Sequence, residues 1–215
     1  MARVQSVFRP DDYPGAPDEA TRKDLAALWE HLFPDGRRGE PHAGYAILAQ
    51  SPRLALHIAR MSDCILNEIG WTQRRDLREL AVQALNYHYK CDFSFRAHLK
   101  LAELSGISLE QQAAMPYWRS SGLFTGEQKL VIEFTLACVS GDVPGELFAR
   151  AVAQFGEKGA IEFTVTVGWW SLWAMLLNAT GPEFSAERSQ PLPKDARELA
   201  AFDPSSPQQR APDET

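Results

Sequence analysis

The sequence is poor in cysteine and has no excess of basic residues. Its three cysteines are an odd number, which excludes the fully paired disulfide framework of a small secreted protein. Lys and Arg together number 22 against 28 for Asp and Glu, and the net charge is −6, whereas a surface for nucleic acid or anionic lipid favours positive charge. The first residues also lack the apolar core of a signal peptide. We therefore expect a cytoplasmic protein that binds neither nucleic acid nor membrane.

Long uncharged segments are almost absent as well. The exception is the stretch from Phe163 to Pro182, which carries no charge and has about the length of a membrane-spanning helix. It contains Thr, Ser, Asn and Gly residues and has no basic flank on its N-terminal side. These features favour a helix that is buried in the core or at a subunit interface.

Alternating strand patterns and internal repeats are missing, and helical spacing of apolar residues dominates the middle of the chain. This spacing, with Gly and Pro stops, predicts three helices over 18–33, 52–69 and 72–89, the third capped by Thr72, and a fourth that ends at Gly106. Two further helices begin at capping boxes of Ser108 and Thr125, and the last two cover 144–155 and 158–179. We expect an all-α domain over residues 21–181. It follows an irregular arm over 1–20 and precedes a polar, Pro-rich tail over 182–215 that is extended or disordered.

The stretch KCDFSFRAH holds the residues best suited to chemistry. Cys91, Ser94 and His98 lie at positions i, i+3 and i+7 of the predicted fourth helix and therefore share one face. Unpaired N–H groups and the helix dipole favour an anion in the first turn of a helix. We therefore expect the pKa of the Cys91 thiol to be lowered, with Lys90 and Arg96 adding to the effect.

Glu79 lies roughly ten residues before the break near Lys90, and His98 lies roughly eight residues after it. At about 1.5 Å per residue, the two side chains would lie at similar heights on antiparallel helices. A carboxylate that faces an imidazole is a standard acid/base arrangement. The spacing therefore permits a cluster of Glu79, His98 and Cys91.

The same residues also permit purely structural interpretations. Glu79 falls on a polar stripe with Gln83 and Asn86 that can be a solvated helix face. Cys91, near a helix start, can be a small buried hydrophobic residue, and His98 can be a core histidine. Spacing alone leaves these alternatives open.

A family resemblance connects the two helices. The stretch RELAVQALNYHYKCDFSFRAHLKLAELSG resembles the core motif of the carboxymuconolactone decarboxylase and AhpD-type alkylhydroperoxidase superfamily, in which peroxidase-type members carry Glu, eleven residues, Cys, two residues, Cys, three residues and His. This register is kept without gaps by Glu79, Cys91, Ser94 and His98. The resemblance implies an AhpD-like helical bundle with a two-helix active-site core. It also implies Glu79, Cys91 and His98 as catalytic residues, and a homo-oligomer such as a trimer or hexamer.

Ser94 is the departure from that motif. It stands where peroxidase-type members have the cysteine that attacks the peroxide, and a serine forms neither a sulfenic acid nor a disulfide. Decarboxylase-type members lack the cysteine pair. The resemblance to them implies proton transfer on a small organic acid, lactone or related carbonyl compound without a cofactor, for which Glu79 and His98 are the groups required.

Four residues are candidates for contact with the substrate. Ser94 can donate a hydrogen bond to a substrate oxygen or fix the tautomer of His98. His88 can line the mouth of a pocket or cap the end of its helix, where a cation is favoured. Arg96 can anchor a carboxylate, and Trp118 can shape an apolar pocket. We expect no metal, because the motif lacks the close-spaced ligand pairs of a zinc site.

Three functions are consistent with these observations. The first is a cofactor-independent enzyme for decarboxylation, elimination or isomerisation of a small carbonyl compound, with Glu79 and His98 as the proton-transfer pair. The second is a thiol-dependent hydroperoxidase that uses Cys91 with a resolving thiol outside the motif. The third is a non-catalytic protein that binds small acids.

Overall fold

The computed structural model describes residues 2–37 and 39–182, and every regular element in this part of the chain is a helix or a helical turn. The all-α prediction is therefore confirmed. The predicted tail lies outside the described residues except for Pro182. Two compact units divide the described chain: residues 2–68 with 176–182, and residues 69–175. The predicted extents of the arm and of a single domain stay predictions.

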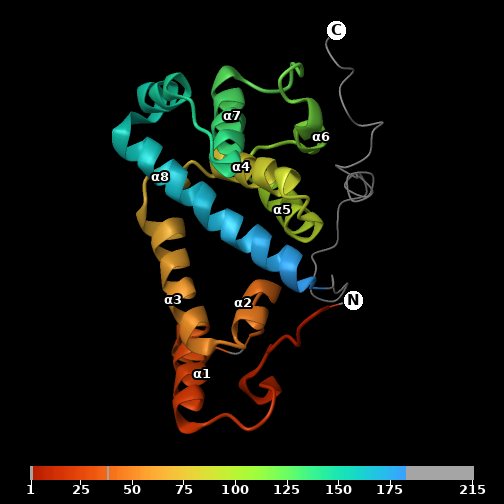
Figure 1. Cartoon of the computed structure of the whole chain (residues 1–215), viewed down its shortest axis with the longest axis vertical. Coiled ribbons are helices and arrows are strands. Elements are labelled where there is room, and N and C mark those ends of the chain that lie inside the picture. The colour runs from red at the N-terminus through yellow and green to blue at the C-terminus, as the bar shows by residue number, and fades with distance from the viewer. Residues whose placement is uncertain (1, 38, 183–215) are drawn as a thin grey trace. The chain divides into compact units, whose positions relative to one another are not determined.

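The first unit is built on two helices that run side by side, α1 (Glu19–Leu32) and α3 (Pro52–Asp63) (Figure 1). Asp18 caps α1, since its carboxylate accepts the Thr21 backbone N–H at 2.7 Å. The other elements are the 3₁₀ turns η1 (Pro10–Asp12) and η2 (Pro34–Gly36), helix α2 (Ala43–Leu48) and the π-helical turn η3 (Cys64–Glu68). The sequence did not indicate α2, because 6 residues are too few to show a helical period.

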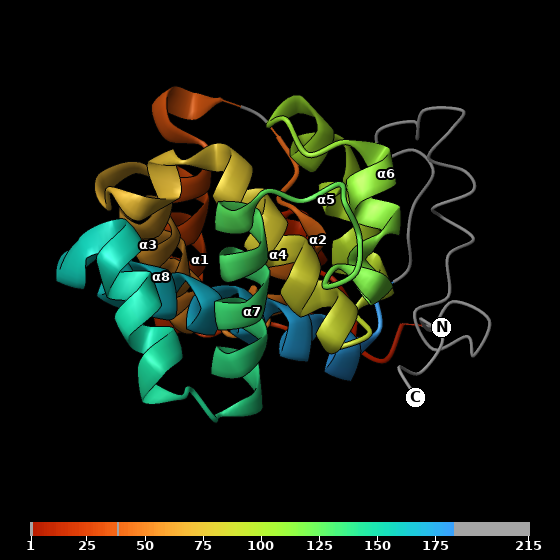
Figure 2. The same ribbon diagram turned by 90° about the horizontal axis from the view of Figure 1, so that it is seen from above.

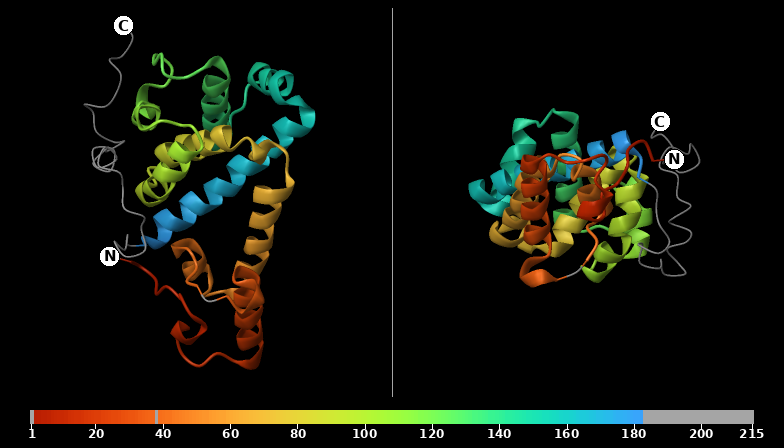
Figure 3. Two further views of the ribbon diagram at one scale, coloured as in Figure 1. Left: turned by 180° about the vertical axis from the view of Figure 1, so that it is seen from behind. Right: turned by 90° about the horizontal axis from the view of Figure 1, so that it is seen from below.

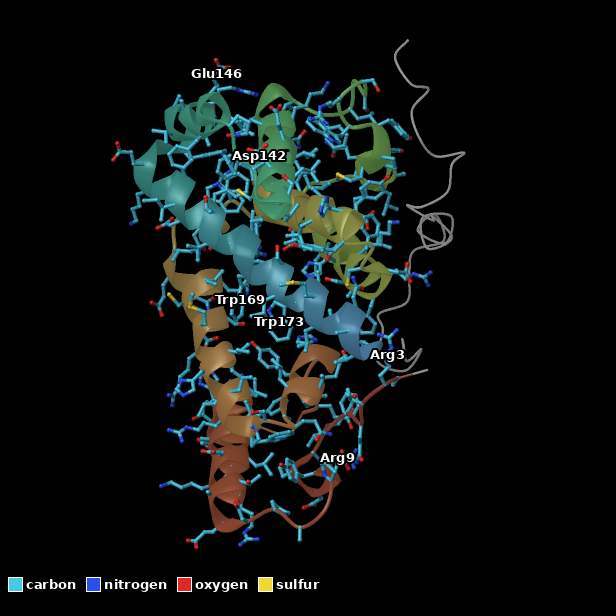
Figure 4. All side chains as sticks on the ribbon, in the orientation of Figure 1. Arg3, Arg9, Asp142, Glu146, Trp169 and Trp173 are labelled. Carbon is cyan, nitrogen blue, oxygen red and sulfur yellow. The ribbon has the colours of Figure 1, made fainter. Side chains whose placement is uncertain are left out.

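The N-terminal arm is tied to the end of α8 (Gly145–Thr180), whose residues from Leu176 onward belong to the first unit. The Arg3 backbone N–H donates to the Thr180 carbonyl at 2.9 Å (Figure 4). Its guanidinium donates to the Ala179 carbonyl, also at 2.9 Å. These bonds satisfy carbonyl groups that the C-terminus of a helix leaves without intrahelical partners. The arm is thus attached to a helix at this point.

The second unit is centred on α4 (Arg75–His88), which packs against α5 (Asp92–Leu104) and α7 (Gly126–Ser140) (Figure 2). Apolar residues of α4 and α7 share one buried core with residues of α8. The remaining elements are η4 (Trp71–Gln73), α6 (Leu109–Ala113), η5 (Met115–Tyr117) and α8 as far as Met175. The predicted capping boxes of Ser108 and Thr125 are present at the starts of α6 and α7.

Thr72 does not cap α4, contrary to the sequence prediction. Its hydroxyl donates to the Ile69 carbonyl at 3.0 Å, and Thr72 lies inside the 3₁₀ turn η4, so that α4 begins only after it. Residues of this turn also contact residues of α8 that are distant in the sequence. The Trp71 backbone N–H donates to the Glu162 carboxylate at 2.8 Å, and the Trp71 ring stacks on Phe163 with ring centroids 4.0 Å apart. A local capping pattern does not report such contacts.

Helix α8 contains one break. At Gly156 the backbone has φ 74° and ψ 166°, a conformation open essentially to glycine alone, so the regular helical path is interrupted there. The predicted boundary between helices 144–155 and 158–179 is thereby confirmed. Among the described residues, α8 is the one helix that is long and apolar enough to cross a membrane, and half of its most apolar 18-residue stretch is buried inside the molecule. By itself this is weak evidence for a membrane span.

Candidate functional site

Helices α4 and α5 form an antiparallel hairpin within the second unit (Figure 3). The predicted motif residues lie on these two helices and at the N-cap of α5. In the connecting turn, Lys90 has a φ of 53°, and the Cys91 N–H donates to the Asn86 carbonyl at 2.9 Å. Three hydrogen bonds join the hairpin in one antiparallel register: Glu79 contacts His98, Gln83 contacts Phe95 and Asn86 contacts Cys91. The polar residues of α4 therefore lie beside the first two turns of α5.

Glu79 and His98 are brought together by this register. His98 Nδ1 lies 2.7 Å from Glu79 Oε2, and Arg78 Nε donates to the other carboxylate oxygen at 3.0 Å. Burial acts to raise the pKa of Glu79. The hydrogen bond and charge of His98, together with Arg78, outweigh it and hold that pKa below its ordinary value. Glu79 is therefore a carboxylate at neutral pH, which orients the imidazole ring and stabilises its cation.

The polar stripe of α4 is buried, so the solvated-face interpretation is wrong. Glu79, Gln83 and Asn86 lie on one helix face, and each is at most 1% exposed. Gln83 Nε2 donates to the Phe95 carbonyl at 3.2 Å and to Gln112 Oε1 at 2.6 Å, which ties α4 to α5 and α6. A helical period in the sequence does not distinguish a polar face turned to water from one turned to a neighbouring helix.

The pKa of the Cys91 thiol is raised, contrary to the lowered value expected from its place at a helix start. Burial raises this pKa, the Ser94 backbone N–H only partly offsets that effect, and the Asp92 carboxylate raises it further. The two cations expected to help do not act on the thiol. Arg96 pairs with Asp92 at 2.8 Å, and Lys90 is exposed. Cys91, the N-cap residue of α5, is therefore a neutral thiol at neutral pH.

The other candidates for substrate contact differ in their surroundings. Ser94 is buried, one turn after Cys91 and one turn before His98 on the same face of α5. His88 is the exposed last residue of α4, and its ring packs edge-on against the ring of the next residue. Trp118 is part of the hydrophobic core of the second unit. In the described part of the chain, no group of three or more His, Cys, Asp or Glu side chains is placed to hold a metal ion.

Arg78 is a site residue that the sequence analysis missed. Its side chain is 15% exposed, and its guanidinium bonds both Glu79 Oε1 and, at 3.4 Å, the Thr72 carbonyl. Neighbouring residues on a helix normally point in different directions, so the pair Arg78–Glu79 carries no pairing signal in the sequence. The length and flexibility of the arginine side chain make the contact possible.

Comparison with known proteins reveals a likeness of fold. No protein-family model matches the sequence, and no curated protein matches it. The chain shares its fold with the debrominase Bmp8. Apo Bmp8 aligns over 92% of this chain and 96% of its own length, with a TM-score of 0.62 and 13% identity. A cysteine-to-alanine variant of Bmp8 in complex with 2,3,4-tribromopyrrole aligns over 86% of this chain and 94% of its own, with a TM-score of 0.61 and 14% identity.

The ionisation of Glu79 predicts a pH-dependent stability. The pKa of Glu79 is lower in the folded protein than in the unfolded chain, where it is about 4.3. Its contribution is therefore complete above that pH and is lost as the pH falls through the folded-state value. At pH 7 we expect Glu79→Gln to lower the free energy of unfolding by about 2 kcal/mol, and we expect this difference to shrink below about pH 4.3.

Thermal unfolding of both proteins between pH 7 and pH 3 measures this difference. Glu110→Gln is the matched control, because Glu110 is an exposed carboxylate of the same unit. The melting temperature of Glu110→Gln should stay close to that of the wild type at every pH between 7 and 3. A difference between the wild type and Glu79→Gln that stays constant or grows in acid would contradict the assigned ionisation.

Proposed function

We propose that the chain is a member of the carboxymuconolactone decarboxylase and AhpD-like superfamily. We further propose that it is an enzyme that transfers a proton on a small organic acid, lactone or related carbonyl compound without a metal or organic cofactor. The observation that carries the proposal is the 2.7 Å contact between His98 Nδ1 and the Glu79 carboxylate. The motif spacing supports the superfamily assignment, and the all-α fold agrees with it.

The orientation of His98 suits a general base. With Glu79 ionised, the Nδ1–H of His98 donates to the carboxylate, and the neutral ring then carries its free lone pair on Nε2. The His98 side chain is 20% exposed, whereas the Glu79 side chain is 2% exposed. The imidazole is thus the member of the pair that can reach a substrate. Nε2 takes a proton from a carbon next to a carbonyl group, Glu79 stabilises the resulting imidazolium, and the imidazolium, after exchange with solvent, returns a proton to the same or a different carbon.

Cys91 and Ser94 fit supporting roles in this chemistry. As a neutral thiol, Cys91 offers a weak donor and a small wall against the substrate ring. The Ser94 side chain adds a hydroxyl on the same face of α5 as His98. Neither role requires a redox change, which agrees with a serine at the second position of the motif.

Proton exchange with solvent tests the proposal across several classes of carbonyl compound at once. The protein is incubated in D₂O with a panel of small lactones, lactams, cyclic imides, 3-keto acids and cyclic ketones, and deuterium at carbon is followed by NMR. We expect enzyme-dependent exchange or loss of CO₂ for at least one carbonyl class, because His98 can take up and return the proton. Absence of both reactions across the panel would rule out the proposed acid/base function.

Thiol chemistry at Cys91 is a second candidate. It is favoured by Cys91 itself, which stands at the first cysteine position of the motif. The fold is shared with the debrominase Bmp8, whose cysteine-to-alanine variant is solved in complex with 2,3,4-tribromopyrrole, so this compound is included in the test. The buried Cys91 with its raised pKa argues against it. Mass spectrometry after a brief peroxide pulse, and bromide release from 2,3,4-tribromopyrrole with added dithiothreitol, test this candidate. An unmodified Cys91 and no bromide would exclude it.

The assembly and location of the protein are part of the same proposal. We propose a cytoplasmic homo-oligomer, a trimer or hexamer as the superfamily resemblance implies, with a small molecule as its substrate. Light scattering of the purified protein measures the number of subunits.

A further inference from the structure

Three buried polar atoms on one face of α4 have no hydrogen-bond partner: Asn86 Nδ2, Asn86 Oδ1 and Gln83 Oε1. Among the described residues, the other buried side-chain polar atoms in this state are Trp71 Nε1 and Thr135 Oγ1. Native proteins keep few such groups, because a buried amide without a partner destabilises the fold. Three such atoms on the helix face that carries Glu79 therefore point to a partner that the described chain does not supply.

The hairpin register places the Asn86 amide at the start of α5. The Asn86 carbonyl accepts the Cys91 N–H, which fixes the two backbones side by side. The Asn86 side chain shares its helix face with Glu79 and Gln83, and both of those side chains reach across to α5. Asn86 lies about 10 Å from Glu79 along the axis of α4. A small ring compound bound by the Asn86 side-chain amide would therefore lie on the helix face that also carries Glu79, about two turns along α4 from the Glu79–His98 pair.

We propose that Asn86 is a substrate-recognition residue and that its ligands are small rings carrying an N–H donor directly beside a carbonyl acceptor, as in a lactam or cyclic imide. A primary amide presents one acceptor and one donor in the same plane, so it forms two parallel hydrogen bonds with such an edge. Gln83 Oε1, one helical turn away on the same face, is a further unpartnered acceptor beside this amide. This inference rests on the proposed function, because it names the substrate class of the same site.

Binding of 2-pyridone, measured by isothermal titration calorimetry, tests the inference. This ring carries adjacent N–H and C=O groups, whereas N-methyl-2-pyridone lacks the donor. The wild type is expected to bind 2-pyridone at least about 10-fold more tightly than the methylated ring. Asn86→Leu is expected to lose at least about 10-fold in affinity for 2-pyridone while its melting temperature stays the same or rises, because an unsatisfied buried amide is removed.

Thr135→Val is the matched control, since Thr135 Oγ1 is also buried without a partner, but on α7. It should keep the melting temperature or raise it and leave 2-pyridone binding unchanged. Asn86→Asp, which keeps the side-chain shape and removes the donor, replaces Asn86→Leu if that variant does not fold. Equal binding by wild type and a folded Asn86 variant would overturn the inference, as would equal binding of the two pyridones.

The outcome is separable from that of the proposed function. Deuterium exchange into a carbonyl substrate by a wild type that does not bind 2-pyridone would overturn the role of Asn86 alone. Binding of 2-pyridone that depends on Asn86, in a protein without any proton-transfer activity, would support the recognition site and reject the acid/base function.

Discussion

Replacing Glu79 with Gln is expected to lower kcat by at least about 100-fold. Gln has nearly the same volume and still accepts a hydrogen bond from His98 Nδ1, so the ring keeps its place. The substitution removes the negative charge that stabilises the imidazolium when Nε2 takes a proton. The loss should therefore appear in kcat, measured on whichever carbonyl compound undergoes exchange, with KM changed much less.

His98→Gln is expected to cause a loss of similar size, and the double variant should be little worse than either single variant. Groups that act as one unit lose their function together, so their effects do not add. Glu103→Gln is the matched control, because Glu103 is a partly exposed carboxylate of α5 that pairs with Lys100. It should keep full activity. Activity within threefold of the wild type in either single variant at the pair would refute the assignment.

Cys91→Ser separates the two candidate chemistries. If Glu79 and His98 carry the reaction, a serine in place of the buried neutral thiol should leave proton-transfer activity within about tenfold of the wild type. If a thiol carries the reaction, the same substitution removes the nucleophile and activity disappears. The raised pKa of Cys91 favours the first outcome, since the thiolate is the reactive form of cysteine.

The part of the site that the sequence predicts is the part set by local geometry. Glu79 lies eleven residues before Lys90 and His98 eight residues after it, so a tight antiparallel hairpin brings them to similar heights, and the structure has such a hairpin. Helix starts with capping boxes are also local, because the cap and the bonded N–H are three residues apart, as at Ser108 and Thr125.

The features that the sequence did not predict depend on contacts distant in the chain. Whether Gln83 and Asn86 meet water depends on what covers α4, which a helical period does not encode. The helix start by itself predicts a lowered pKa for Cys91, whereas burial by the surrounding fold raises it. Trp118, expected in a pocket, belongs to the core, because aromatic composition alone does not tell the two environments apart.

Replacing Phe163 with Ala is expected to lower the free energy of unfolding of the second unit by about 3–5 kcal/mol. Phe163 is fully buried, and its ring lies 4.0 Å from Trp71, 4.8 Å from Phe134 and 5.9 Å from Phe155 between centroids. Alanine removes the shared centre of this aromatic cluster and leaves a cavity that rigid neighbouring rings fill poorly. Urea denaturation followed by tryptophan fluorescence measures the change, since Trp71 itself reports on the cluster.

Leu104→Ala is the control, because Leu104 lies in the same unit and is 72% exposed, and it should change the free energy of unfolding by less than about 0.5 kcal/mol. If the urea midpoint of Phe163→Ala equals that of Leu104→Ala, the aromatic cluster does not stabilise the second unit as predicted. Phe163→Ala should also affect the candidate site under conditions where the protein is still folded. Trp71 and Thr72 belong to the turn that precedes α4, and the Thr72 carbonyl accepts a hydrogen bond from the Arg78 guanidinium that also contacts Glu79. Loss of the stack on Trp71 should therefore lower kcat under conditions where the protein is still folded, which connects the packing of α8 to the ionised carboxylate on α4.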